Sequence, residues 1–274
     1  MPSSDDSSRA TTTPSAVTLL GTLARTTARR HVQVTANAPI CMATHDEWDE
    51  ARARELHDDL VSLYDPVEKA AEHGSDPDAA PGDGVRQLLT TILSQNVADQ
   101  NTRRASESLF DQYADFAAIE AAAHDELADT IRVAGLPDQK ASRIQRALSA
   151  TREETGGAYS LAFLDALPTD EAKAWLMDIK GVGPKTASVV LNFHFGKPTM
   201  AVDTHVERVS KRFGLVPSSA TNGRAHDVID GIIPDELTYP LHVLLIQHGR
   251  TYCSARSPDC DNPVCETYCR CEGC

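Results

Sequence analysis

Apolar residues recur along most of the chain at intervals of three or four, which is the spacing of one face of an α-helix. In the segment EAKAWLMDI, for example, Trp175, Leu176 and Ile179 keep this spacing. The strict alternation of apolar and polar residues that marks a half-buried β-strand is almost absent. The pattern therefore predicts an all-α protein.

The helical pattern covers several segments, with turn-forming residues between them. They are residues 45–64, 85–96, 101–113, 140–154, 171–179, 204–214 and 239–253. We expect Thr169 to cap the helix at 171–179, because a threonine hydroxyl can accept a hydrogen bond from the first turn. Residues 70–84 combine Gly, Pro and Asp and are predicted to form a loop or linker.

The segment IKGVGPKTASVVL, residues 179–191, interrupts the helical pattern with a short turn. We expect Gly181 and Gly183 to take positive φ there and Pro184 to start the next helix, which makes a helix-hairpin-helix unit. Backbone N–H groups at glycines approach an anion closely, and the start of the second helix adds positive potential, so a phosphodiester fits. A Gly-x-Gly turn that only joins two helices is the alternative.

Charge is distributed unevenly along this acidic chain. It holds 40 acidic and 26 basic residues for a net charge of -14, and seven of the basic residues are lysines. Residues 180–212 reverse the sign, with six cations, two anions and four of the seven lysines. Contact with phosphates is a physical reason to retain cations here. The acidic, lysine-poor remainder suits a salt-accumulating halophile, and an ordinary acidic protein is the alternative.

Two residues in this basic region are suited to chemistry. Lys185 is expected at about the second position of the new helix, where the helix dipole disfavours a cation and lowers the pKa of the amine. A neutral amine is a potential nucleophile. Asp203 precedes a predicted helix in AVDTHVERV and suits an N-cap. Its carboxylate can also stabilise a developing oxocarbenium ion or assist proton transfer, and the two roles are compatible.

Cysteine is concentrated near the end of the chain, where six of the seven cysteines lie between Cys253 and Cys274. A secreted disulfide scaffold spreads its cysteines along a short chain, so a single terminal cluster indicates a metal or iron–sulfur site in a reducing compartment. Four thiolates suit a [4Fe-4S] cluster, and a zinc site with four cysteine ligands is the alternative.

Residues 1–41 differ in composition from the rest, being rich in Ser, Thr and Ala with four arginines and two acids. Such a composition resembles an organelle transit peptide, but we expect a disordered tail or a true start at Met42. It is left out of the fold prediction. No apolar run of about eighteen residues occurs, so no membrane-spanning helix is expected.

Four motifs occur together in a fixed order: LLTTILSQNVADQNT, GLPDQKASRI, IKGVGPKTASVVLNFHFGKPTMAVDTHVERV, and LLIQHGRTYC before the cysteines. In this order they resemble the endonuclease III family of DNA glycosylases over residues 85–274. The resemblance implies two helical domains that grip DNA. One is a six-helix barrel ending in the hairpin, residues 85–197. The other joins residues 46–84 to 198–274 and ends in a [4Fe-4S] cluster loop.

The resemblance also implies roles for individual residues. Lys185 matches the nucleophilic lysine of the family, and Asp203 matches its catalytic aspartate. The residues expected to bind DNA are Gln95, Asn96, Lys180, Gly181, Val182 and Gly183. Of these, Gln95 and Asn96 match a loop that enters the gap left by a flipped base, with a polar helix end as the alternative.

The chemistry implied by the resemblance is that of a bifunctional base-excision repair enzyme. The expected partner is double-stranded DNA with a damaged base or an abasic site, and the protein is expected to act as a monomer. After an oxidised pyrimidine is flipped out of the duplex, the Lys185 amine would attack C1′ of the sugar. The Schiff base acidifies the C2′ proton, and β-elimination nicks the strand. A mismatch or purine glycosylase and a noncatalytic DNA-binding module are the alternatives. We expect a cytoplasmic, nucleoid-associated location.

The cysteine spacing departs from the family pattern C-x6-C-x2-C-x5-C. Cys253 and Cys260 keep the first interval, but Cys265 comes two residues late. Cys271 preserves the last interval from Cys265, whereas Cys269 preserves the overall span. We expect the ligands to be Cys253, Cys260, Cys265 and Cys271, with Cys269 as the alternative to Cys271. The loop between the first two expected ligands carries one basic residue, Arg256, and one acidic residue, Asp259, whereas this loop is basic in the family. A contact of the loop with DNA is therefore not assumed.

Overall fold

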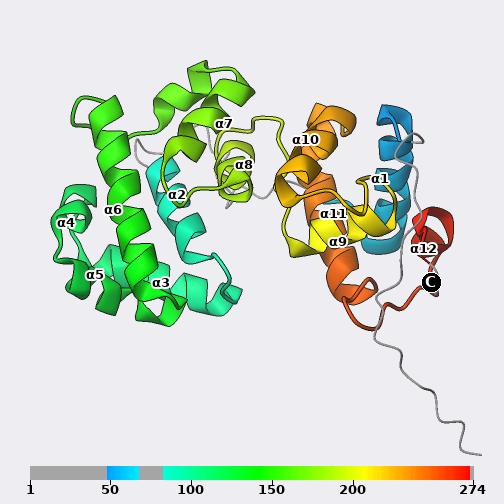
Figure 1. Ribbon diagram of the computed structural model, residues 1–274, viewed down its shortest axis with the longest axis horizontal. Coiled ribbons are helices and arrows are strands. Elements are labelled where there is room, and N and C mark those ends of the chain that lie inside the picture. The colour runs from blue at the N-terminus through cyan, green and yellow to red at the C-terminus, as the bar shows by residue number, and fades with distance from the viewer. Residues whose placement is uncertain (1–47, 68–82, 272–274) are drawn as a thin grey trace, which may run out of the picture. The chain divides into compact units, whose positions relative to one another are not determined.

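The computed structural model of the chain describes residues 48–67 and 83–271 (Figure 1). The regular elements in these two ranges are helices, which confirms the predicted all-α class. None of the helices in the described ranges is long and apolar enough to cross a membrane. The predicted N-terminal tail, and all but the end of the predicted linker at 70–84, lie outside the described residues.

The helices expected from periodicity occur, and the structure adds several short ones. The α-helices are α1 (Glu50–Tyr64), α2 (Asp83–Leu93), α3 (Asp99–Gln112), α4 (Phe116–Ala121), α5 (His124–Thr130), α6 (Pro137–Glu154), α7 (Thr169–Asp178), α8 (Pro184–Phe193), α9 (Thr204–Arg212), α10 (Asn222–Ile232), α11 (Thr238–Thr251) and α12 (Pro263–Tyr268). The 3-10 helices are η3 (Arg132–Ala134), η4 (Ala162–Ala166) and η5 (Asp235–Leu237). The pattern does not predict α4, α5, α10 or α12. Three of these have six or seven residues, which is too short to display a period of 3.6.

One set of buried residues joins the helices from α2 to α8. Leu88, Leu89 and Ile92 of α2 are inaccessible to solvent, and α2 packs against α6 and α8. Ile144 and Leu148 of α6 belong to the same core. Burying one such side chain contributes about 1.5–3 kcal/mol relative to leaving it exposed. This apolar stripe therefore fixes the helices that surround the hairpin between α7 and α8.

A second set of buried residues joins α1 to α9, α10, α11 and α12 (Figure 1). Leu56 and Leu60 of α1 are buried, and α1 packs against α11 and α12. The indole N–H of Trp48 donates to the carbonyl of Phe213 at 3.2 Å, and the ring of Trp48 lies 5.8 Å from that of Tyr268. Residues from the two ends of the described chain thus share one core.

The segment 197–203, which leads from α8 to α9, is held by polar contacts. Asp230 of α10 accepts hydrogen bonds from Lys173 Nζ at 2.7 Å and Thr199 Oγ1 at 3.0 Å, and from the backbone N–H of Met200 at 2.8 Å. Asn192 of α8 donates to the carbonyl of Thr199 at 3.0 Å. These contacts position the backbone that enters α9. The division into domains at 46–84 with 198–274 and at 85–197 stays a prediction.

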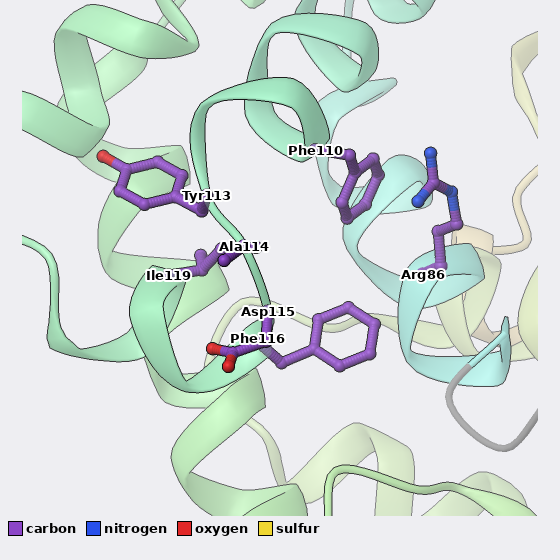
Figure 2. Close-up of a pocket in the computed structure, with 7 residues that line it drawn as sticks. All are labelled: Arg86, Phe110, Tyr113, Ala114, Asp115, Phe116 and Ile119. Carbon is purple, nitrogen blue, oxygen red and sulfur yellow. The ribbon is translucent and has the colours of Figure 1, made fainter.

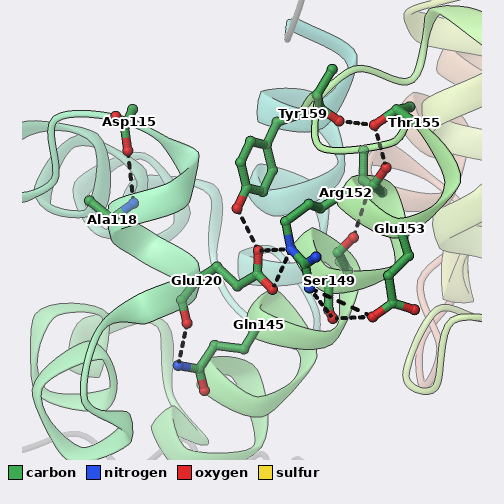
Figure 3. Close-up of polar contacts among 12 residues, drawn as sticks. Asp115, Ala118, Glu120, Gln145, Ser149, Arg152, Glu153, Thr155 and Tyr159 are labelled. Carbon is green, nitrogen blue, oxygen red and sulfur yellow. Dashed lines mark hydrogen bonds and ion pairs between the residues drawn. The ribbon is translucent and has the colours of Figure 1, made fainter.

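A partly buried ion pair between Glu120 and Arg152 ties α4 to α6 (Figure 3). Arg152 Nε donates to both carboxylate oxygens of Glu120, at 3.2 and 3.1 Å, and the hydroxyl of Tyr159 donates to one of them at 2.5 Å. Burial opposes ionisation of Glu120, but the hydrogen bonds from Arg152 and Tyr159 outweigh it and lower the pKa of the carboxyl group. Gln145 adds hydrogen bonds to two backbone carbonyls. The network compensates the partial desolvation of the Glu120 charge.

The start of α7 differs from the prediction. Thr169 is the first helical residue, and Pro168 occupies the N-cap position without a side-chain hydrogen bond. Proline fixes φ near -65°, and Pro168, with φ -54° and ψ 150°, leads the chain straight into the first turn. The predicted cap by Thr169 is therefore wrong, whereas the acids Asp170 and Glu171 do lie in the first turn.

Candidate active site

The hairpin between α7 and α8 has the predicted connection but a different backbone. Ile179 is the C-cap of α7, and the N–H of Val182 donates to its carbonyl at 2.9 Å. Gly181 takes positive φ, at 105°, as predicted. Gly183 does not: it is the N-cap of α8, with φ -104° and ψ 178°. An N-cap residue normally adopts extended backbone, so the expectation of positive φ at Gly183 is wrong. Pro184 is the first residue of α8, as predicted.

Only Gly181 of the two needs the absence of a side chain for packing. A Cβ there would lie 2.5 Å from Cγ of Arg143, whereas a Cβ at Gly183 would meet no atom within 4 Å. Gly181 and Lys180 are exposed, but the side chain of Val182 is buried in the first core. A phosphate at this turn would therefore meet the backbone of Val182 and not its side chain.

Lys185 is the second residue of α8 and is half-buried. Burial is the main cause of the lowered pKa of its amine; the nearby carboxylates of Asp203 and Asp99 act in the opposite direction. The lowered pKa of Lys185 agrees with the expectation. Its cause differs, because the structure shows desolvation where the sequence suggested only the helix dipole. The structure thus places the amine of Lys185 within electrostatic reach of two acids.

Asp203 is the N-cap of α9, as one of the two predicted roles requires. Its Oδ1 accepts hydrogen bonds from the backbone N–H groups of His205 and Val206, each at 2.8 Å. These bonds hold the carboxylate in one orientation, close enough to Lys185 to affect the pKa of the amine. The catalytic role of Asp203 stays a prediction.

His242 is a member of this group that the sequence did not reveal. It lies on α11, is almost completely buried, and interacts electrostatically with both Asp203 and Lys185. Burial lowers its pKa to about 4, so the ring is neutral at pH 7. Its Nδ1 lies 2.8 Å from the carbonyl of Ala201, which can only accept, so Nδ1 carries the proton. A histidine within an apolar helical run was the only available signal in the sequence.

Asp99 was also missed. It is the first residue of α3, and its carboxylate lies 3.7 Å from the guanidinium of Arg250 on α11. Both side chains are largely exposed, so the pair alone contributes little to stability. Asp99 matters because its carboxylate is close enough to Lys185 to raise the pKa of the amine. An acidic residue at the start of a polar helix gives no sign of this in the sequence.

Gln95 and Asn96 follow the end of α2 and lie in a turn beside the hairpin. Gln95 Nε2 donates to the carbonyl of Gly181 at 3.3 Å and to Thr186 Oγ1 at 3.1 Å. Arg143 donates to Gln95 Oε1. Asn96 is exposed and takes the left-handed conformation, with φ 56°. The structure therefore brings the predicted DNA-probing loop into contact with the predicted phosphate-binding turn.

Four of the six cations in residues 180–212 make internal contacts. Lys197 donates to two backbone carbonyls at 3.0 and 2.6 Å, and Lys211 pairs with a glutamate one turn away at 2.6 Å. Arg208 donates to two carbonyls near the end of α11, and Arg212 binds the cysteine loop. At these four positions the cations of residues 180–212 therefore stabilise the folded protein. Phosphate contact remains a prediction for the hairpin, where Lys180 is exposed.

The described cysteines, from Cys253 to Cys271, follow α11. Cys253 and Cys265 are buried, and Arg212 Nη1 donates to Cys253 Sγ at 3.1 Å. Nε2 of His248 lies 3.3 Å from Cys265 Sγ. Among the residues that the structure describes, no group of three or more His, Cys, Asp or Glu is arranged to hold a metal ion. An N–H group that points at a sulfur, as that of Arg212 does at Cys253, offsets the charge of a thiolate ligand, which suits an iron–sulfur or a zinc site.

A pocket of about 270 Å³ lies elsewhere in the fold (Figure 2). The lining residues are Arg86, Phe110, Tyr113, Ala114, Asp115, Phe116 and Ile119. The guanidinium of Arg86 lies 3.8 Å from the ring centre of Phe110. None of the predicted site residues lines this pocket.

Comparison with known proteins places these features in a family. The sequence profile of the HhH-GPD superfamily base excision DNA repair proteins matches residues 89–229. Endonuclease III of Thermotoga maritima is 34% identical over 187 residues, which are 68% of this chain and 83% of that protein. Endonuclease III of Rickettsia felis is 36% identical over 182 residues, 66% of this chain and 80% of that protein.

The solved structures that resemble the chain include two of endonuclease III with DNA. A non-covalent endonuclease III–DNA complex superimposes with a TM-score of 0.63 at 30% identity, covering 81% of this chain and 95% of the other. A trapped endonuclease III–DNA covalent intermediate gives the same values. A thermostable thymine-DNA glycosylase superimposes with a TM-score of 0.61 at 19% identity over 80% of this chain and 95% of that chain, and shares the fold.

Proposed function

Because the chain belongs to the HhH-GPD superfamily of base excision DNA repair proteins, we propose that it removes oxidised pyrimidines from double-stranded DNA and nicks the resulting abasic site. Membership of this family makes it a DNA glycosylase and abasic-site lyase. What we add is the substrate class and the roles of individual residues.

The observation that carries the mechanism is the half-buried amine of Lys185 beside Asp203. A lowered pKa increases the fraction of neutral amine, which is the nucleophilic form. The amine attacks C1′ as the bond from C1′ to the base breaks, and the carboxylate of Asp203 stabilises the positive charge that develops on the sugar. One amine proton passes to the departing base and the other to the ring oxygen O4′ as the sugar ring opens, which gives a Schiff base between Lys185 and C1′. Removal of a C2′ proton then breaks the bond from C3′ to its phosphate oxygen.

Borohydride trapping tests the nucleophile. Reduction of the imine should link the protein covalently to abasic DNA, and the Lys185→Gln variant should lose this product. Lys211→Gln is a matched control, because Lys211 pairs with Glu207 and has no role in the reaction. Undiminished trapping in Lys185→Gln would show that another amine reacts.

The substrate class is tested with duplexes that each contain one lesion. Thymine glycol should be excised faster than uracil, 8-oxoguanine or a mismatched base. Preferential excision of a purine or a mismatched thymine would favour the alternative glycosylases. Binding to every duplex without excision of any base would favour a noncatalytic DNA-binding module.

We also propose that Cys253, Cys260, Cys265 and Cys271 hold a [4Fe-4S] cluster. Support comes from the buried sulfurs of Cys253 and Cys265 and from the N–H group of Arg212 that points at Cys253. When bound, the cluster would supply a cross-link between α11 and the cysteine loop. The purified protein should be brown, with visible absorption and about four irons per chain; a colourless protein with one zinc would contradict this proposal.

The choice between Cys271 and Cys269 needs a pair of variants. Cys271→Ser should lose the visible absorption, and Cys269→Ser should keep it. The reverse result would make Cys269 the fourth ligand.

The cellular setting is proposed from composition. The acidic, lysine-poor chain fits the cytoplasm of a salt-accumulating halophile. At molar salt the screening length is about 3 Å, so binding of this monomer to DNA would depend on close contacts at the hairpin. Excision should persist in molar potassium chloride, and activity confined to low salt would contradict a halophilic origin.

A further inference from the structure

Lys140 on α6 is a lysine with no solvent exposure. Its Nζ donates to three backbone carbonyls: Leu93 at 2.7 Å, Gln95 at 2.9 Å and Ala134 at 2.7 Å. An ammonium has three donors, so this group is fully satisfied. A buried charge is costly unless it is hydrogen-bonded. The three acceptors show which parts of the backbone this ammonium holds in place.

Two of the acceptors lie at the end of α2 and in the turn that follows it. Leu93 is the last residue of α2, and carbonyls at a helix C-terminus lack helical partners and carry negative potential. Gln95 precedes Asn96, which has positive φ. The ammonium therefore caps α2 and fixes the backbone of the turn that presents Asn96.

The third acceptor belongs to a different exposed turn. Ala134 ends η3 and precedes Gly135 and Leu136, which both have positive φ, at 67° and 49°. Leu136 is 52% exposed, unusual for a large apolar side chain. A non-glycine residue in the left-handed region is strained. The structure thus holds an exposed leucine in a costly conformation, through the same ammonium that holds the turn of Asn96.

Arg143, one turn further along α6, supports the same arrangement independently. Arg143 donates to the side-chain oxygen of Gln95, whose amide in turn donates to the carbonyl of Gly181 and to Thr186. Lys140 thus holds the backbone of Gln95 while Arg143 holds its side chain. Helix α6 in this way connects the turn after α2 to the hairpin.

We propose that Lys140 is a positioning residue that staples the turn at 93–96 to the turn at 134–136, so that Asn96 and Leu136 meet the DNA duplex together. This inference rests on the DNA glycosylase function proposed above. Apolar wedges and polar side chains that enter a duplex act by unstacking bases, so the relative position of the two turns bears on base extrusion. Lys140 touches no reacting atom, and its effect falls on base extrusion and not on the chemistry at C1′.

The test compares two substrates in the full-length protein. The side chain of Lys140→Gln keeps two hydrogen-bond donors, whereas that of Lys140→Met has none. Base excision from a duplex should therefore be lower in Lys140→Gln than in the wild type, and lower still in Lys140→Met, by about tenfold or more. Trapping on a single-stranded abasic site, which needs no extrusion, should change less than about threefold. Lys197→Gln is the matched control, because Lys197 also donates to two loop carbonyls; any loss there should affect both substrates equally.

A double-mutant cycle keeps the inference testable if Lys140→Met does not fold. If Lys140 acts through the turn of Asn96, the losses in excision caused by Lys140→Gln and Asn96→Ala should be far from multiplicative. Multiplicative losses, or equal losses on duplex and single-stranded substrates, would overturn the positioning role. A wild-type protein that excises no oxidised pyrimidine would instead refute the proposed function.

Discussion

At the residue scale, the state of Lys185 shows how burial and neighbouring charge combine. The helix start in the sequence suggested an amine held neutral by the helix dipole. In the structure, burial lowers the pKa, while Asp203 and Asp99 partly restore the charged form. The amine is therefore not isolated from carboxylates, and its reactivity depends on both effects.

Asp203→Asn separates the structural and chemical roles of Asp203. Asparagine is a good N-cap, so the thermal midpoint should change little, whereas Asp203→Ala should cost about 1 kcal/mol of stability. Loss of the carboxylate should lower excision by about 100-fold, because charge development on the sugar is no longer stabilised. It also removes a group that raises the pKa of Lys185. The acidic limb of the pH–rate profile for trapping should therefore move to lower pH; a shift to higher pH would contradict the arrangement.

At the element scale, the hairpin is largely a local structure. The end of α7 at Asp178, the glycines and the proline at the start of α8 all come from adjacent residues. The conformations of the two glycines differ because only Gly181 turns the chain, while Gly183 enters a helix as its N-cap. Gly181 also packs directly on Arg143 of α6.

Gly181→Ala should destabilise the protein by about 1–3 kcal/mol, since alanine is strained at positive φ and its Cβ would overlap Arg143. Gly183→Ala is the matched control: its φ is negative and the space is open, so stability should change by less than about 1 kcal/mol. Urea denaturation at constant pH measures both. Equal destabilisation of the two variants would show that the turn does not depend on the geometry of Gly181.

At the scale of the whole molecule, buried histidines couple folding to pH. Burial lowers the pKa of His226 and of His242 to about 4. Their Nδ1 atoms lie 3.0 and 2.8 Å from the backbone carbonyls of Met200 and Ala201, in the segment that leads to Asp203. Both are neutral in the folded protein above about pH 5.

The free energy of unfolding should fall as the pH falls through the window between 6.5 and 4. In that window the unfolded chain binds protons that the folded chain excludes, so acid favours unfolding. Between pH 7 and pH 5 each histidine contributes a loss of about 2 kcal/mol. His226→Gln should flatten the dependence measured by urea denaturation. The exposed His124 supplies the control, and an identical flattening in His124→Gln would contradict the assignment to buried histidines.

Local features of the sequence predicted much of the fold and part of the site. Periodicity located α1, α2, α3, α6, α7, α9 and α11, which each show an apolar face in the sequence. It missed α4, α5 and α12, where a helix of six or seven residues shows no repeat, and it also missed α10, which has 11 residues. The helix-hairpin-helix motif around Lys185 could be recognised in the sequence, because the hairpin turn and the expected nucleophile are neighbours in the chain.

The sequence by itself determined the helical class, the hairpin and the order of the family's motifs, since these depend on residues within one or two turns of each other. Only the tertiary structure decided that His242 and Asp99 interact with Lys185, or with the aspartate beside it, and that Lys140 joins two separate turns. It also decided that four of the six cations of the basic window make internal contacts, with backbone carbonyls, a glutamate or a cysteine. The reason is physical: burial and hydrogen-bond partners are supplied by helices distant in sequence, and no local pattern encodes which of them meet.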